Sequence, residues 1–284
     1  MVGFIQGKNQ LVSISMVEKP FEGFPDSFFA GLVIFIVPAL ILFTSQPFAP
    51  YQFPHPVVFY LSVFFTIAII TGLVGWGNLV EYLGFDLVQP GERIEQVWWR
   101  FPILLFFGFL VGFGLYKWSN FASSLLGLPM LSLPLDSALA VYFLSYPLVF
   151  STVNWIVVAF FEEVMRNTGV FIFANALSKR FNLKADSAFV GGVILASIAF
   201  IILHLPAWQF TGNVASYLFG IGASMLFTLI GYVLYVKGLW GKLTFAEFSI
   251  IAPITAHFVF DLSIDWKLRS LISPMALLGI YLFM

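Results

Sequence analysis

Long apolar runs alternate with short polar connections along almost the whole chain. A helix that crosses a bilayer needs about 20 consecutive, mostly apolar residues, and most of these runs come close to that length or exceed it. The candidate spans are Ser27–Ser45, Pro56–Trp76, Phe101–Lys117, Ser137–Phe181, Ser187–Leu205, Val214–Val236, Phe245–Leu262 and, shortest of all, Leu271–Met284. This pattern predicts an all-α, polytopic membrane helix bundle of about eight transmembrane helices, in a single transmembrane domain over residues 1–284.

Two segments interrupt the regular alternation. Segment Asn78–Arg100 carries several acidic residues and ends in Trp98 and Trp99, so it is interpreted as a polar connector with an aromatic anchor at the membrane interface. The run Ser137–Phe181 is too long for one simple span and contains Pro147. It predicts either one kinked helix or a span followed by a surface helix.

The composition agrees with a chain that is solvated by lipid. Apolar residues make up 60% of it and charged residues only 10%, whereas a soluble domain is about 25% charged. Membrane lipid is therefore the expected surrounding partner. The formal net charge of -1 argues against nucleic acid as a partner. The absence of cysteine excludes disulfides, thiolate metal ligands and a cysteine nucleophile.

The basic residues orient the predicted bundle. Most of the 13 Lys and Arg residues fall in connections on one side, and only Lys117, Lys267 and Arg269 fall on the other. Because Lys and Arg are enriched in cytoplasmic loops, we expect an integral, multi-pass membrane protein with both termini in the cytoplasm. This orientation assumes that Ser137–Phe181 crosses once, since a double crossing would flip everything before it.

A few ionisable side chains lie inside the apolar runs instead of at their ends. Such groups cost at least about 2.5–3.5 kcal/mol each on insertion scales, so they mark a functional site or a paired polar network. They are Glu162, Glu163, Arg166, His204, His257 and Asp261.

The spacing of these residues predicts specific contacts. Glu162 and Arg166 are four residues apart, so they share a helix face and could form an ion pair. His257 and Asp261 have the same spacing, which lets the carboxylate orient the imidazole. Phe200 precedes His204 by four residues, which places an aromatic ring beside that imidazole.

Depth in the membrane provides a consistency test. If Thr152–Arg180 is one helix, a rise of about 1.5 Å per residue puts the three motifs at similar depths, roughly 22–30 Å from the basic side. If the span ends at Glu162 instead, the glutamates lie at the basic surface, far from both histidines. Convergence on one site therefore requires the continuous helix.

The motifs, taken in order, resemble a known family. Glu162-Glu163 with Arg166, then Phe200-x-x-x-His204, then His257-x-x-x-Asp261 is similar to the three-motif signature of the CPBP family. This family includes the type II CAAX prenyl endopeptidases and the bacteriocin-processing or immunity proteases. Leu83-Gly84-Phe85 and Lys237-Gly238-Leu239-Trp240 resemble the segments that accompany the motifs. The resemblance covers residues 80–265, a CPBP-like core.

The first motif departs from the family pattern. Family members usually have Glu-Glu-x-x-x-Arg, whereas Arg166 follows Glu162 by only four residues, and Asn167 stands where glycine is common. If the glutamates anchor the alignment, Arg166 is displaced by about 100° around the helix. If the arginine anchors it, Phe161 takes the place of the first glutamate.

The resemblance implies an intramembrane endopeptidase in which a glutamate-activated water attacks a peptide bond with histidine assistance. The catalytic residues would be Glu162, Glu163, His204 and His257, with Arg166, Asp261 and Phe200 in orienting or structural roles. A metal-free reaction on a peptide or lipopeptide is preferred, and the alternative is a zinc ion held by Glu162, His204 and His257. A second function class is a catalytically silent CPBP-like membrane scaffold, complex subunit or immunity factor. A transporter ranks third, because no inverted repeat supports it.

Overall fold

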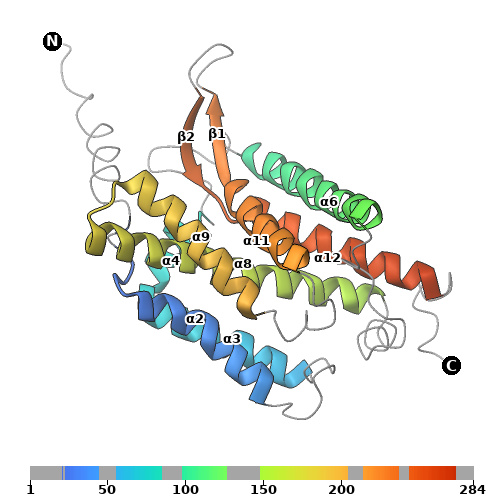
Figure 1. Ribbon diagram of the computed structural model, residues 1–284, viewed down its shortest axis with the longest axis horizontal. Coiled ribbons are helices and arrows are strands. Elements are labelled where there is room, and N and C mark those ends of the chain that lie inside the picture. The colour runs from blue at the N-terminus through green and yellow to red at the C-terminus, as the bar shows by residue number, and fades with distance from the viewer. Residues whose placement is uncertain are drawn as a thin grey trace.

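The computed structural model describes residues 21, 23–44, 56–84, 98–126, 148–203, 214–236 and 243–272. Within these residues the chain is predominantly helical, as the sequence predicts, and it also contains one short β-ribbon (Figure 1). The helices are α2 (Phe28–Thr44), α3 (Pro56–Val74), α4 (Trp76–Tyr82), α6 (Arg100–Leu126), α8 (Leu148–Phe181), α9 (Ala185–Leu203), α11 (Val214–Leu229) and α12 (Ile251–Ile272).

Helix α8 is the centre of the fold. It contacts α9, α12, α2 and α3, and in its second half residues 163–176 are all buried. Asn182, with a positive φ of 52°, lies in the short turn between α8 and α9. Gly192 lets α9 approach the backbone of α8 near Val170, where a side chain would collide. This close contact with α9, together with the packing of α2, α3 and α12, buries the second half of α8.

The ambiguity of the run Ser137–Phe181 is settled for its described part. Helix α8 begins at Leu148, the residue after Pro147 in the sequence, and continues without a break to Phe181. The continuous helix expected over Thr152–Arg180 is therefore confirmed. Residues 137–147 lie outside the described part of the chain.

Two candidate spans, Val214–Val236 and Phe245–Leu262, were wrong at their facing ends, which are strands and not helix. Helix α11 ends at Leu229, and the expected span Val214–Val236 finishes instead in strand β1 (Tyr232–Val236). Strand β2 (Leu243–Phe248) occupies the start of the expected span Phe245–Leu262 and pairs antiparallel with β1. Short apolar runs rich in β-branched and aromatic residues fit a strand as well as a helix, so hydropathy alone could not separate them.

The base of the ribbon positions α12. The Ser249 amide donates to the Gly231 carbonyl at 2.7 Å, and the Ile250 amide donates to the Leu83 carbonyl at 2.8 Å. The Ser249 hydroxyl donates to the Gly84 carbonyl at 3.0 Å. The residues just before α12 are therefore tied to the residues just after α4 and α11, which fixes where the helix that carries His257 begins.

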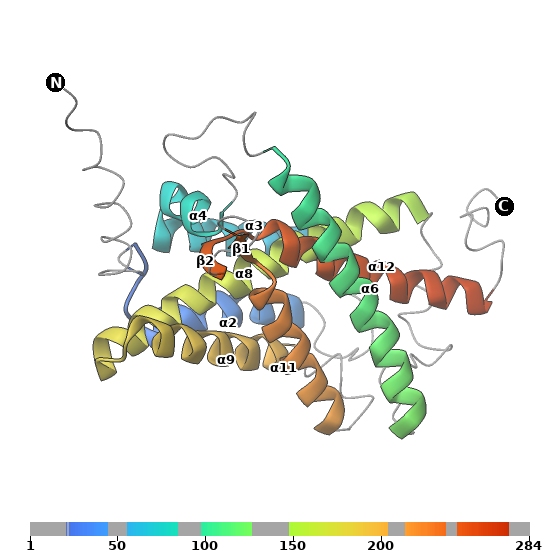
Figure 2. The same ribbon diagram turned by 90° about the horizontal axis from the view of Figure 1, so that it is seen from above.

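Helix α6 packs closely along α12 by means of small residues. A side chain at Gly108 would meet Thr255, and one at Gly112 would meet the backbone of Ala256. Apart from this contact stripe, α6 exposes many large apolar side chains, among them Phe106, Phe107 and Phe109. In Figure 2, α6 and α11 run across the direction of α8 and α9.

Two helices of the described chain, Arg100–Leu125 of α6 and Leu148–Phe181 of α8, are long and apolar enough to cross a membrane. Shorter apolar helices lie within α2, α3, α9 and α11. The expected last span, Leu271–Met284, lies outside the described residues except for the end of α12.

Candidate active site

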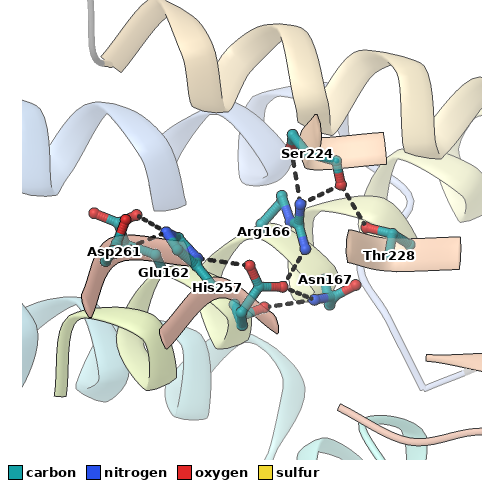
Figure 3. Close-up of polar contacts among 8 residues, drawn as sticks. Glu162, Arg166, Asn167, Ser224, Thr228, His257 and Asp261 are labelled. Atoms are coloured by element: carbon teal, nitrogen blue, oxygen red, sulfur yellow. Dashed lines mark hydrogen bonds and ion pairs between the residues drawn. The ribbon is translucent and has the colours of Figure 1, made fainter. Parts of the chain in front are cut away.

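The candidate site lies where α8 and α12 face each other, with α11 alongside (Figure 3). Helix α8 supplies Glu162, Glu163 and Arg166, and α12 supplies His257 and Asp261. The structure therefore brings the first and third sequence motifs together.

Glu163 is the most enclosed carboxylate of the site. Its side chain is 0% exposed, and its Oε2 accepts hydrogen bonds from Arg166 and from Asn167 Nδ2, the latter at 3.1 Å. Asn167 Nδ2 also donates to the main-chain oxygen of Glu163 at 2.8 Å. One turn of α8 thus provides both partners, three and four residues after the glutamate, which are the spacings that meet on a helix surface.

Arg166 forms its ion pair with Glu163 and not with Glu162. The i,i+4 spacing predicted that Arg166 would pair with Glu162, but its salt bridge is made with Glu163, at i,i+3. Both spacings allow contact on a helix, so the choice depends on what surrounds each glutamate. Arg166 points toward α11, where its Nη1 donates to the carbonyl and hydroxyl oxygens of Ser224.

His257 links all three carboxylates of the site. Its Nδ1 lies 2.8 Å from Glu163 Oε1, while its Nε2 lies 3.4 Å from both Glu162 Oε2 and Asp261 Oδ2. Because oxygen atoms of carboxyl groups face both ring nitrogens, a proton is needed on each side of the ring. Either the imidazole carries both protons, or one of the carboxyl groups carries one. Asp261 lies beside the ring, as the i,i+4 spacing predicts.

The two sides of the imidazole differ in exposure. Glu162 and Asp261 retain side-chain exposures of 17% and 16%, whereas Glu163 and Arg166 are fully buried. The Nε2 side of His257 is therefore the side that a water molecule or substrate can approach. The Nδ1 side is a closed polar network.

Two aromatic rings complete the surroundings. Phe200 of α9 meets His257 edge to face at 6.3 Å, and Phe227 of α11 stacks on His257 at 5.3 Å. Phe200 was singled out by its place in the second motif. The sequence did not assign three residues to the site: Phe227, Ser224 and Asn167. No motif lies on α11, which carries the first two, and Asn167 was interpreted as a helix-packing residue. The position of Asn167, four residues after Glu163, could have indicated that it contacts this carboxylate.

A second polar contact joins the same two helices farther along. Asp265, eight residues after His257, is fully buried. Ser151 donates to Asp265, and Trp155 Nε1 donates to it at 3.3 Å. Helices α8 and α12 are therefore held together by polar groups at two places, and the site is one of them.

His204, the remaining catalytic candidate and a member of the alternative zinc ligand set, lies outside the described residues. In the described part of the chain, no three His, Cys, Asp or Glu side chains are spaced to hold a metal ion.

Comparison of the chain with protein-family models, with curated proteins and with solved structures finds no match in any of the three.

Proposed function

We propose that the protein is a membrane-embedded endopeptidase of the CPBP type, in which Glu162 activates the hydrolytic water. The observation that carries this proposal is the pairing of one histidine with two carboxylates in different surroundings. Glu163 is saturated by Arg166, Asn167 and His257, while Glu162 is partly exposed on the open side of the same ring. This division provides one enclosed carboxylate that holds the imidazole and one partly exposed carboxylate that would act as the base.

The geometry supports a simple sequence of proton transfers. A water molecule beside Glu162 gives a proton to its carboxylate as the water oxygen attacks the peptide carbonyl carbon. His257 Nε2, 3.4 Å from Glu162 Oε2, donates a proton to the amine as the carbon–nitrogen bond breaks. The proton on Glu162 then restores the one that His257 has lost. Glu163 keeps the imidazole oriented through Nδ1, and Asp261 is a positioning residue on the Nε2 side.

The irregular first motif is compatible with this assignment. Arg166 reaches Glu163 even though one residue fewer separates them than in the family pattern. Asn167 occupies the position four residues after Glu163 and donates to the same carboxylate. Arg166 and Asn167 therefore both bind the second glutamate of the motif, which supports the alignment anchored on the glutamates.

Zinc remains the alternative chemistry. Glu162 Oε2 and His257 Nε2 lie 3.4 Å apart, so a metal that bound both would have to replace the proton between them. His204 would be the third ligand. Bound zinc would polarise the substrate carbonyl or lower the pKa of its water.

The proposal also includes a membrane topology. We place the protein in the membrane as a multi-pass helix bundle with both termini in the cytoplasm. Support comes from the apolar composition, the two membrane-length helices and the many exposed large apolar side chains. The substrate would then be a peptide or lipopeptide that reaches the site from within or beside the bilayer.

A second candidate function is a catalytically silent scaffold, complex subunit or immunity factor. The network of Glu163, Arg166, Asn167 and Ser224 favours it, because Arg166 joins α8 to Ser224 of α11 and none of these contacts requires a substrate. The two functions differ in what Glu162 does, since a scaffold has little use for a partly exposed carboxylate.

The deciding experiment compares Glu162→Gln with Glu163→Gln in purified protein. Gln keeps the shape of Glu and removes the proton-accepting charge, so E162Q should abolish cleavage of a peptide and lipopeptide panel without lowering the thermal midpoint. E163Q should instead destabilise the protein, because Arg166 loses its buried counter-charge.

The same assay separates the alternatives. Loss of wild-type cleavage with a chelator, and its recovery with zinc, would favour the zinc chemistry. A wild-type protein that is inert on the whole panel, with E162Q as stable as wild type, would replace the protease by the scaffold. Equal cleavage by E162Q and wild type would remove Glu162 from the mechanism.

A further inference from the structure

Phe227 lies where one aromatic ring contacts two partners of Glu163, His257 and Arg166. Its ring centroid is 5.3 Å from that of His257, with an interplanar angle of 23°. The Arg166 guanidinium carbon lies 5.6 Å from the same ring. Because His257 and Arg166 bind the two oxygens of Glu163, Phe227 covers the network that holds this carboxylate.

The ring has a counterpart on another helix. Phe200 of α9 lies 5.9 Å from the Arg166 guanidinium carbon and meets His257 nearly edge on, at 83°. Arg166 and His257 are therefore flanked by two aromatic rings from two different helices. Ring faces attract cations and stack on planar groups in preferred orientations, so this arrangement restricts the tilt of both side chains.

Phe227 is itself held firmly. It is buried, and Phe260 of α12 packs against it at 6.3 Å. Ser224, one turn earlier on α11, receives Arg166 on its carbonyl and hydroxyl oxygens (Figure 3). The outer face of α11 is exposed at Leu218, Leu226 and Leu229. Contacts around the site therefore secure this end of α11.

We propose that Phe227 is a positioning residue that sets the plane of the His257 imidazole relative to Glu162 and Glu163. Its effect on cleavage rests on the proposed function, whereas its effect on the imidazole does not. The ring supplies a flat face, which an aliphatic side chain of similar size cannot replace. A misplacement of about 1 Å can cost roughly 100-fold in rate, so a small tilt of His257 would be visible.

The test replaces Phe227 with Leu, which keeps an apolar side chain and removes the ring. Phe227→Tyr retains the ring, and Phe219→Leu makes the same Phe-to-Leu change at a half-buried position on the same helix. In F227L we expect kcat to fall roughly 10- to 100-fold with KM within a factor of about two of the wild-type value. We expect F227Y to recover most of the rate and F219L to behave as wild type.

A second readout does not depend on activity. In histidine-labelled protein, the His257 ring signals can be assigned by their loss in His257→Gln. Stacking on Phe227 should shift the His257 ring protons upfield, so F227L should move them downfield, while F227Y and F219L leave them in place. If F227L is too unstable to purify, Phe227→Met removes the ring with a flexible apolar side chain and should give the same shifts.

Unchanged His257 signals in F227L or F227M would overturn the proposal, as would an equal change in F219L. A parallel fall in kcat and thermal midpoint in F227L and F219L would make Phe227 an ordinary packing residue. If the wild type cleaves nothing while the signals shift as expected, the proposed function fails and the positioning role stands.

Discussion

At the scale of single residues, the site is organised by the difference between two neighbouring glutamates. Successive residues of a helix point about 100° apart, so Glu162 and Glu163 cannot face the same surroundings. Glu163 faces Arg166, Asn167 and His257 in a fully buried network, and Glu162 faces the open side of the imidazole. An adjacent pair of identical residues therefore provides one enclosed and one partly exposed carboxylate.

The buried ion pair should matter far more than the exposed one on the same helix. Arg166→Met leaves Glu163 buried without its cation, which should cost about 3–5 kcal/mol of stability. Lys179→Met removes a pair with Asp26 whose side chains are more than half exposed, and it should cost at most about 1 kcal/mol. Thermal unfolding of both variants in the same detergent checks this. A K179M midpoint as low as that of R166M would contradict it.

At the scale of helices, close backbone contact decides where the site residues lie. Gly112 of α6 lies against the backbone of Ala256, the residue before His257. Small residues allow this approach in membrane helix pairs. The position of His257 along α12 therefore depends on α6, although α6 contributes no side chain to the described site.

Two glycines on α6 make a matched test of this contact. Ala is a better helix former than Gly by about 1 kcal/mol, so Gly114→Ala, with open space around its added methyl group, should leave stability unchanged or raise it. Gly112→Ala would collide with the Ala256 backbone, and overpacking of this kind costs about 1–3 kcal/mol. We expect a lower thermal midpoint for G112A alone and, if the proposed function holds, reduced cleavage as well. Similar midpoints for the two variants would show that α6 adjusts freely.

At the scale of the whole molecule, ionisable side chains are buried and large apolar side chains are exposed, which is the reverse of the arrangement in a soluble protein. Ionisable side chains of the site are enclosed between helices, while large apolar side chains are exposed on α2, α3, α6 and the first half of α8. Extended exposed apolar surface on a soluble monomer is rare, and lipid is the solvent that suits it. Helix α8, at 34 residues, is about 51 Å long by its helical rise, which exceeds a bilayer core of about 30 Å.

The proposed topology predicts which ends of the helices are accessible from each side. The chain has no cysteine, so single cysteines at Ser123 and Ser178 can be labelled without background. Ser178, near the basic end of α8, should react with an impermeant maleimide from the cytoplasmic side, and Ser123, near the end of α6, from the opposite side. Labelling of both from one side would refute the single crossing of α8.

The sequence by itself determined that the chain is predominantly helical and where most of its helices lie. Hydropathy over 20-residue windows depends only on local composition, and it located α2, α3, α6, α8 and α9 with errors mainly at their ends. The i,i+4 spacing of His257 and Asp261 predicted their contact, because both residues lie on one helix. The cost of charge in an apolar run was enough to identify Glu162, Glu163, Arg166, His257 and Asp261 as a set.

Only the tertiary structure decided the features that depend on contacts between segments far apart in the chain. It assigned the apolar residues at 232–236 and 243–248 to a ribbon, because each strand needs the other as a hydrogen-bonding partner. It also placed Arg166 against Glu163 and not Glu162, because the guanidinium donates to Ser224 of α11 on the side of the helix where Glu163 lies. It also brought Phe227 onto His257, a contact across 30 residues of sequence that no local spacing rule can predict.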